Sequence, residues 1–340
     1  MDRRVLIRTW IVICFLLTAL AGCREGDSGN SAAESPKEFA GDYPIQIVAT
    51  VGMVGDIVRA VGGEHVLVEQ LMGAEIDPHT HNPTRDDVQK MRQADLIVYN
   101  GLHLEGKMTD TLENLGKRKP VVAVTDGLDE DVLLSPDGSR DHSDPHVWMD
   151  VSLWSKAVDV VATALSDFDP KHAADYHANA KKYQEQLQSL HEYGLKVIGS
   201  IPEERRILIT SHDAFNYFGR AYDLQVEGVQ GLSTESEAGL RRVNDLVQLI
   251  VDRKVSAVFV ESSVSSKNIQ ALIEGAKSKG HEVRIGGMLY SDAMGNAGTY
   301  EGTYIGMLDA NLTRIARALG GQASPGGMQD RLSSETENGT

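Results

Sequence analysis

Short apolar runs alternate with helix-length segments along most of the chain. Four runs lie in the first half of this region and four in the second, at residues 45–50, 66–72, 96–101, 121–127, 206–211, 224–229, 256–262 and 282–288. Strand-length runs separated by helical patterns are typical of βαβ units, in which the strands are parallel. The pattern therefore predicts an α/β protein with two parallel-sheet lobes, residues 44–168 and 201–321.

One long helix is predicted between the two lobes, over residues 169–200. Asp169 is a plausible N-cap and Pro170 suits the first helical position. Apolar residues recur at spacings of three, four or seven and form one buried stripe, which comprises Tyr176, Ala180, Tyr183, Leu187, Leu190 and Val197. About 29 helical residues span about 44 Å, so this helix is long enough to run along both lobes and to join them rigidly.

The N-terminus has the pattern of a secretory signal peptide over residues 1–22. An arginine-rich start is followed by an apolar run too short for a membrane span. The run ends in Leu-Ala-Gly-Cys, which resembles the lipobox of bacterial lipoproteins, with Cys23 as the lipidated residue. We therefore expect an exported protein that is lipid-anchored to a bacterial membrane and faces the periplasm or the cell exterior.

The segments that flank the two lobes are poor in apolar residues. Residues 23–43 and 322–340 are rich in serine, glycine and acidic side chains, which predicts a disordered tether and a loose tail. The other cysteine, Cys14, lies inside the predicted signal peptide, so the mature chain has no disulfide. Its stability must come from apolar burial, and the composition, 41% apolar, is sufficient for two cores.

The net charge narrows the possible partners. A formal charge of −16 disfavours nucleic acid as a ligand. Most acidic side chains of such a protein are solvated, so the charge alone says nothing about cation binding.

We expect the mature protein to be a monomer.

Polar residues with metal-binding chemistry follow several of the predicted strands. The tripeptide Asp-Pro-His occurs twice in the first lobe and places His79 and His146 there, while the second lobe has His212 and Asp292 after strands. Each residue taken alone is explained better by a turn, a loop contact or a helix cap than by metal binding. Ligands of open parallel sheets bind beyond the carboxyl ends of the strands, so together the four side chains predict a site for a first-row divalent metal ion in the cleft between the lobes.

Five further residues are candidates for roles around this site. His81 and His142 lie close to the two Asp-Pro-His tripeptides, but solvated positions suit both better. Glu235, Glu237 and Glu261 are expected to support the ligands or to contact a carrier protein.

The ordered motifs resemble the zinc- and manganese-binding receptors of ATP-binding-cassette importers, the helical-backbone metal receptors. The resemblance covers nearly the whole mature chain and rests on Asp77-Pro78-His79 with Thr84 and Asp87, "DPHVWMD" at 144–150, "SHDAFNYFGRAY" at 211–222, "SEAGL" at 236–240, "VFVES" at 258–262, "LYSDAMG" at 289–295 and "GTYIGM" at 302–307. It implies that His79, His146, His212 and Asp292 are the metal ligands. It also implies a receptor that delivers manganese or zinc to a membrane permease powered by a separate ATPase.

Two other functions remain open at this stage: an adhesion or scaffolding lipoprotein with a structural metal, and a metallohydrolase. The second is disfavoured because catalytic zinc sites keep a position open for water, whereas four protein ligands would close this one, so we expect no enzyme. The ligands do not separate manganese from zinc. Zinc-dedicated relatives often have a histidine-rich loop before the second ligand, where this chain has only His142. Some manganese-dedicated relatives have a glutamate where this chain has His212. Manganese is slightly favoured, with zinc as the close alternative.

Overall fold

The computed structural model describes residues 38–135 and 142–332. The predicted signal peptide, Cys23 and residues 333–340 lie outside the described residues. None of the helices in the described ranges is long and apolar enough to cross a bilayer.

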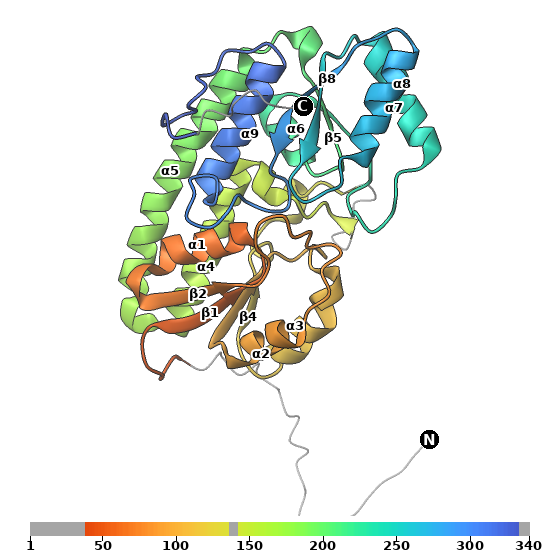
Figure 1. Cartoon of the computed structure of the whole chain (residues 1–340). Coiled ribbons are helices and arrows are strands. Elements are labelled where there is room, and N and C mark those ends of the chain that lie inside the picture. Colours follow the sequence, from red (N-terminus) through yellow and green to blue (C-terminus); the bar gives the residue numbers. More distant parts are fainter. Residues whose placement is uncertain (1–37, 136–141, 333–340) are drawn as a thin grey trace, which may run out of the picture. The chain divides into compact units, whose positions relative to one another are not determined.

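The first lobe is a four-stranded parallel sheet in the order β2-β1-β3-β4 (Figure 1). Its strands are β1 (Ile45–Ala49), β2 (Val66–Gln70), β3 (Leu96–Tyr99) and β4 (Val121–Ala123), and its helices are α1 (Gly52–Gly62), α2 (Arg85–Gln93), α3 (Thr109–Gly116) and α4 (Val151–Phe168). Helix α2 begins with a capping box, in which Thr84 and Asp87 each accept the other's backbone N–H. The predicted strands and their parallel direction are confirmed.

The second lobe contains two parallel strand pairs instead of one continuous ladder. Strand β5 (Ile207–Thr210) pairs with β6 (Gln225–Gly228), and β7 (Ala257–Glu261) pairs with β8 (Arg284–Leu289). The helices of this lobe are α6 (Asn216–Tyr222), α7 (Leu240–Asp252), α8 (Lys267–Ser278) and α9 (Tyr304–Ala318). The pairing of β7 with β8 shifts register between Val258 and Val260, opposite Gly286 and Gly287, and the φ of 142° at Gly287 is a conformation that glycine adopts readily.

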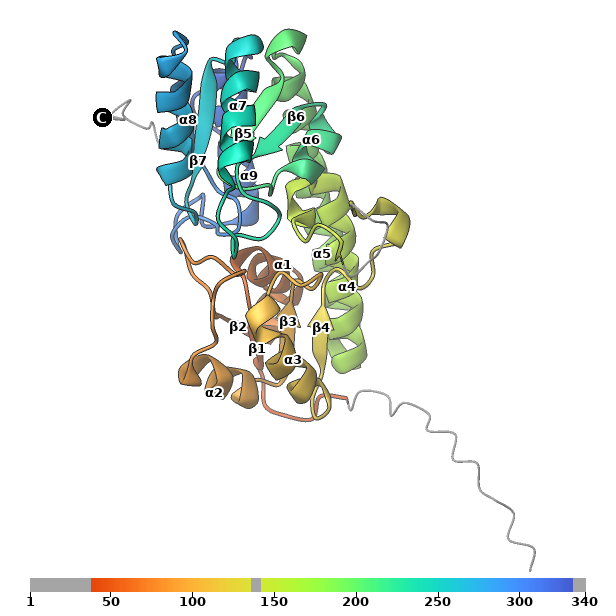
Figure 2. The same cartoon turned by 90° about the vertical axis from the view of Figure 1, so that its right-hand side faces the viewer.

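Helix α5 (Ala173–Gly199) packs against both lobes, as Figures 1 and 2 show. All six residues of the predicted apolar stripe are buried. The Tyr183 hydroxyl donates to Asp56 of α1 at 2.6 Å, and the hydroxyls of Tyr193 and Thr313 of α9 lie 2.8 Å apart. The long helix is therefore bonded to one helix of each lobe, and the predicted architecture of two lobes on one long helix is confirmed.

The start of this helix differs from the prediction. Residues Pro170–His172 form a 3₁₀ turn before α5, and the Asp169 side chain accepts no bond from the backbone of that turn. Its carboxylate instead accepts the hydroxyls of Tyr43 and Tyr176 and lies 2.7 Å from Nδ1 of His172. Asp169 thus joins the N-terminal segment to α5, a role that depends on Tyr43, which is 126 positions away in the sequence.

Parts of both predicted flexible segments are packed in the structure. Phe39 donates its N–H to the Phe168 carbonyl, and the two rings lie 5.5 Å apart. At the other end, the N–H of Met328 donates to the buried carboxylate of Asp309, and Arg331 lies over the Tyr300 ring. Phe39 at one end and Ala323 and Met328 at the other pack against the core, which accounts for the difference over residues 39–43 and 322–332.

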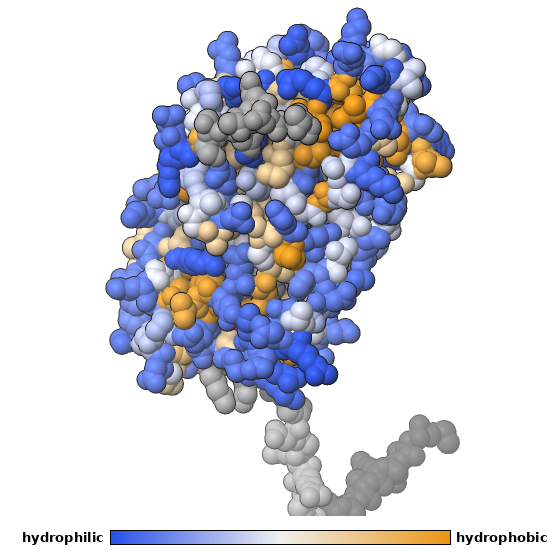
Figure 3. Space-filling view, viewed as in Figure 1, coloured by the Kyte–Doolittle hydropathy of each residue, from blue (hydrophilic) through white to orange (hydrophobic). Residues whose placement is uncertain are grey.

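The larger buried apolar cluster is continuous across the boundary between the lobes. One cluster runs from the first sheet through α4 and α5 into α6 and α9, and a smaller one lies among β5, β7, α7 and α8. The face of the molecule shown in Figure 3 is mostly hydrophilic, consistent with the acidic composition. Because α5 and the larger cluster belong to both lobes, a wide hinge motion would expose core residues.

We expect the radius of gyration to change by less than about 1 Å when a ligand between the lobes is removed. Small-angle X-ray scattering of chelator-treated and metal-loaded protein measures this change. A difference of several ångströms would show that the lobes open despite their common core.

Candidate metal centre

Four buried side chains converge beyond the carboxyl ends of the strands. His79 and His146 come from the first lobe, and His212 and Asp292 follow β5 and β8 of the second. One potential ligand atom from each residue lies within 4.8 Å of all the others, and all four residues are at most 5% exposed. The structure therefore brings together the four residues that the sequence predicted as ligands.

Each of the three imidazoles directs its Nε2 atom toward the same centre. Nε2 of His146 lies 3.3 Å from Nε2 of His79 and 3.4 Å from Nε2 of His212. Bonds of 2.0–2.1 Å to a tetrahedral metal ion would place its nitrogen ligands about 3.3–3.4 Å apart. The spacing thus suits a first-row divalent ion bound at all three Nε2 atoms.

The Asp292 carboxylate faces the same centre with both oxygens. Oδ1 lies 3.3 Å from Nε2 of His146, and Oδ2 lies 3.2 Å from Nε2 of His212 and 3.7 Å from that of His79. Within the described residues neither oxygen has a partner with hydrogen-bond geometry, although the residue is 1% exposed. A buried carboxylate needs positive charge beside it; a metal ion at the centre would supply that charge, and His146 and His212 are its nearest partners when no metal is bound.

Both Asp-Pro-His tripeptides form the same turn. Asp77 accepts the N–H of His79 and Asp144 accepts the N–H of His146, each at Oδ1 and each at 2.9 Å. An aspartate that bonds to the backbone two residues ahead forms an Asx turn. This local bond holds the backbone of each histidine before any metal is present.

Carboxylates also orient two of the imidazole rings. Nδ1 of His146 lies 2.7 Å from Asp144, and Nδ1 of His212 lies 2.5 Å from Glu261, which in addition accepts the N–H of His212. A hydrogen bond at Nδ1 leaves Nε2 as the nitrogen that can bind metal. Asn216 donates to the second oxygen of Asp144, so α6 of the second lobe supports a histidine of the first.

Trp148 connects the histidine of one lobe to the aspartate of the other. Its Nε1 donates to the carbonyl of Ser291, which precedes Asp292, at 2.9 Å, while its ring lies 5.2 Å from that of His146. Tyr304 donates to the Trp148 carbonyl at 2.7 Å. These bonds hold the backbone next to Asp292 close to the segment that carries His146, across the cleft.

The surroundings of the three histidines shift their pKa values in different directions. Burial lowers the pKa of His79 to about 4. Burial also opposes charge on His146 and His212, but the carboxylates beside them outweigh it, raising the pKa of His146 to about 9 and that of His212 well above its ordinary value. Burial disfavours the charge of Asp292 as well, yet His212 and His146 hold its pKa well below the ordinary value. These shifts favour protonation of His146 and His212 and ionisation of Asp292 at neutral pH when no metal is bound.

Metal binding should release about two protons per ion near pH 7. His146 and His212 must lose their Nε2 protons to bind, whereas His79 and Asp292 are already deprotonated, so affinity should fall as pH decreases from about 9 toward 4. Calorimetric titration in buffers of different ionisation enthalpy counts these protons. Binding without proton release would contradict the assigned charge states.

The other candidate residues lie outside the cluster. His81 lies 3.3 Å from the Asp87 carboxylate of the capping box, and His142 and Glu237 are exposed. Glu235 forms an ion pair with Lys107. Glu261 is not one of the four either, but it bonds to His212 twice.

The roles of Asp144, Asn216 and Trp148 were not predicted from the sequence. The repeated Asp-Pro-His was a usable signal for Asp144, since an aspartate two residues before a histidine can form an Asx turn. No local pattern distinguishes Asn216 or Trp148, whose contacts join segments distant in sequence.

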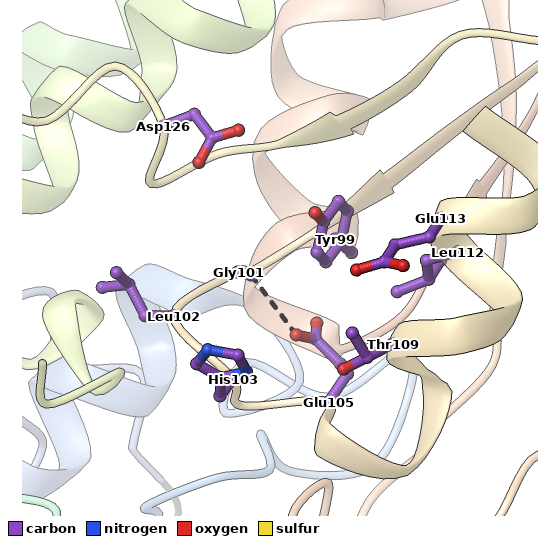
Figure 4. A pocket seen from close by; sticks show the side chains of 9 residues that line it. All are labelled: Tyr99, Gly101, Leu102, His103, Glu105, Thr109, Leu112, Glu113 and Asp126. Carbon is purple, nitrogen blue, oxygen red and sulfur yellow. Dashed lines mark hydrogen bonds between the residues drawn. The ribbon is translucent and has the colours of Figure 1, made fainter. Parts of the chain in front are cut away.

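A separate cavity of about 200 Å³ lies in the first lobe (Figure 4). It is lined by Tyr99, Gly101, Leu102, His103, Glu105, Thr109, Leu112, Glu113 and Asp126. The buried Glu105 carboxylate accepts the Thr50 hydroxyl and the N–H groups of Asn100 and Gly101. These bonds explain its burial without a ligand.

Two α/β lobes on one long helix, with three imidazoles and a carboxylate buried between them, define the class of helical-backbone metal receptors. A family model described as "Zinc-uptake complex component A periplasmic" matches residues 47–318. The chain belongs to this family, whose members are substrate-binding proteins of ATP-binding-cassette importers.

The chain is also similar to curated proteins over nearly its full length. It is 46% identical over 307 residues to the "Manganese-binding lipoprotein MntA" of Bacillus subtilis (strain 168), covering 90% of this chain and 97% of that protein. It is 41% identical over 314 residues to the "Zinc-binding protein TroA" of Treponema pallidum (strain Nichols), covering 92% and 99%.

Solved structures share the fold. The periplasmic zinc-binding protein TroA from Treponema pallidum superposes with a TM-score of 0.78 at 43% identity, covering 81% of this chain and 98% of that one. Fe(III)-bound YtgA from Chlamydia trachomatis superposes with a TM-score of 0.74 at 27% identity, covering 82% and 99%. The names of these similar proteins thus include manganese, zinc and iron.

Proposed function

We propose that this protein is an extracytoplasmic receptor that binds one divalent metal ion through His79, His146, His212 and Asp292 and delivers it to an importer. The observation that carries the proposal is the buried convergence of three Nε2 atoms and one carboxylate on a single centre. The bonds of Asp144 and Glu261 to the imidazole Nδ1 atoms are the outer interactions expected around a metal site.

In this function the metal is cargo and the protein is not an enzyme. Four buried protein ligands leave no open position for a catalytic water. The receptor hands the ion to a membrane permease powered by a separate ATPase, the partners that the family implies. The alternative of an adhesion or scaffolding lipoprotein differs in one measurable respect, because it does not require metal to be released.

We further propose that the mature protein is a monomer held at a bacterial membrane by lipid on Cys23. The support is the Leu-Ala-Gly-Cys sequence after an apolar run, and the names of similar proteins that include the word lipoprotein. Mass spectrometry of the protein from its native membrane tests the anchor. A mature N-terminus elsewhere than residue 23 would contradict it.

Manganese is the proposed physiological cargo, with zinc as the alternative. Asp292 presents each of its oxygens to a different imidazole, so it can bind an ion through both and raise the coordination number above four, which zinc sites rarely do. Metal analysis of protein isolated from its native membrane tests this choice. Zinc in that sample, together with expression induced by zinc starvation, would overturn it.

The test of the function itself is a metal titration of chelator-stripped protein. We expect one tight site per chain and thermal stabilisation, by about 2.7 kcal/mol when free metal is one hundred times the dissociation constant. In cells, deletion should impair growth when the metal is scarce. Normal uptake and growth of the deletion strain would remove the proposed role in import.

A further inference from the structure

The loop between β6 and α7 reaches from the second lobe to the turn that carries His79. Thr234 Oγ1 in this loop donates to Asp77 Oδ2 at 2.5 Å. The other oxygen of Asp77 accepts the N–H of His79 at 2.9 Å. One carboxylate therefore joins a loop of the second lobe to the backbone of a proposed ligand of the first.

The loop is held in a defined conformation next to this contact. The side chain of Gln230, which is 8% exposed, donates to the carbonyls of Thr234 and Ser236 at 3.4 and 3.0 Å. Beside Thr234, Glu235 pairs with Lys107 of the first lobe. The hydroxyl of Thr234 is thus presented to Asp77 by a structured loop, and a second contact between the lobes lies next to it.

The two Asp-Pro-His turns use their carboxylates in parallel ways. In each turn Oδ1 of the aspartate accepts the histidine N–H, and Oδ2 accepts a donor from the second lobe. For Asp144 that donor is Asn216 in α6, whereas for Asp77 it is Thr234 in a loop. Asp144 also contacts the ring of its own histidine. The Asp77 bond is therefore the one that can break with a loop movement.

We propose that Thr234 and Asp77 form a latch that ties the β6–α7 loop to the His79 turn and sets the rate at which bound metal leaves. The proposal rests on the function proposed above. His79 must separate from the second lobe before the ion can escape, and the bond between Thr234 and Asp77 opposes that separation. Hydrogen bonds to carboxylates are among the stronger ones in proteins, so the latch should slow release by about tenfold.

The neighbouring ion pair should contribute much less. The side chains of Lys107 and Glu235 are 44% and 46% exposed, and ion pairs of such exposure contribute little. Loss of the Thr234–Asp77 bond and loss of the Glu235–Lys107 ion pair should therefore change the rate of metal release by different amounts, although Thr234 and Glu235 are neighbours in the sequence.

The test measures zinc release from loaded protein into excess chromophoric chelator by stopped flow. Thr234→Val removes the hydroxyl at nearly constant volume and should speed release about tenfold, and Thr234→Ala serves as a second variant without the hydroxyl. Thr234→Ser keeps the donor, and Glu235→Gln removes only the ion pair, so both should stay within about twofold of the wild type.

A control separates the latch from general damage to the site. The absorption spectrum of bound Co²⁺ reports the ligands directly, and it should be the same in Thr234→Val and wild type, with one ion bound in each. Release from Thr234→Val at the wild-type rate, or release from Thr234→Ser as fast as from Thr234→Val, would overturn the latch while leaving the receptor function intact. A wild-type protein that retains no metal would instead overturn the proposed function.

Discussion

Replacing His212 with alanine should abolish tight metal binding. His212 contributes one of three converging Nε2 atoms and is fully buried, so the vacancy cannot be filled by a neighbouring side chain without rearrangement. Loss of an outer partner of a metal site typically costs 10–100-fold in affinity, and loss of a ligand should cost more. Titration against a competing chelator measures the change.

The matched control is His177→Ala, which removes an exposed imidazole on α5. This variant should bind metal as the wild type does. Glu261→Gln should give an intermediate result, weaker by about 10–100-fold, because it alters only the partner of His212. Wild-type affinity and metal-dependent stabilisation in His212→Ala would exclude this histidine from the site.

Replacing Trp148 with alanine should lower the free energy of unfolding by about 3–5 kcal/mol. The side chain is fully buried and donates to the Ser291 carbonyl across the cleft, so both packing and a connection between the lobes are lost. Metal affinity should fall as well, because Ser291 precedes Asp292. Urea denaturation followed by circular dichroism measures the stability of the metal-free protein.

A pair of phenylalanine variants separates the hydrogen bond from packing. Trp148→Phe keeps an aromatic ring but leaves the Ser291 carbonyl without its donor, which should cost about 1–3 kcal/mol and weaken metal binding. Trp154 is equally buried, and its Nε1 has no hydrogen-bond partner within the described residues. Trp154→Phe should therefore leave metal affinity unchanged. Equal loss of affinity in the two variants would contradict the role given to the Trp148 bond.

The sequence predicted the features that depend on local pattern. The eight strand-length apolar runs are visible because strands covered on both faces are apolar nearly throughout. The stripe from Tyr176 to Val197 is visible because burial of one helix face imposes a period. The four proposed ligands could be named because parallel strands place their carboxyl ends at one edge and because their motifs resemble those of a known family.

Features set by contacts between distant segments were not predictable in this way. Asp169 stands where an N-cap is expected, yet its carboxylate accepts the hydroxyls of Tyr43 and Tyr176 and contacts His172. Met328 lies in a polar tail, but its N–H bonds to Asp309 of α9. The bonds from Thr234 to Asp77 and from Trp148 to Ser291 link residues 157 and 143 positions apart. Such pairs leave no periodic signal in one sequence.

The ligand set of the bound ion is the most direct test of the account. X-ray absorption spectroscopy at the metal edge, on protein loaded with one equivalent of zinc or manganese, counts imidazole ligands from their multiple scattering. The structure predicts three imidazoles and one carboxylate, with zinc–nitrogen distances of about 2.0–2.1 Å. A shell of oxygen ligands alone, or fewer than three imidazoles, would contradict a site built from His79, His146, His212 and Asp292.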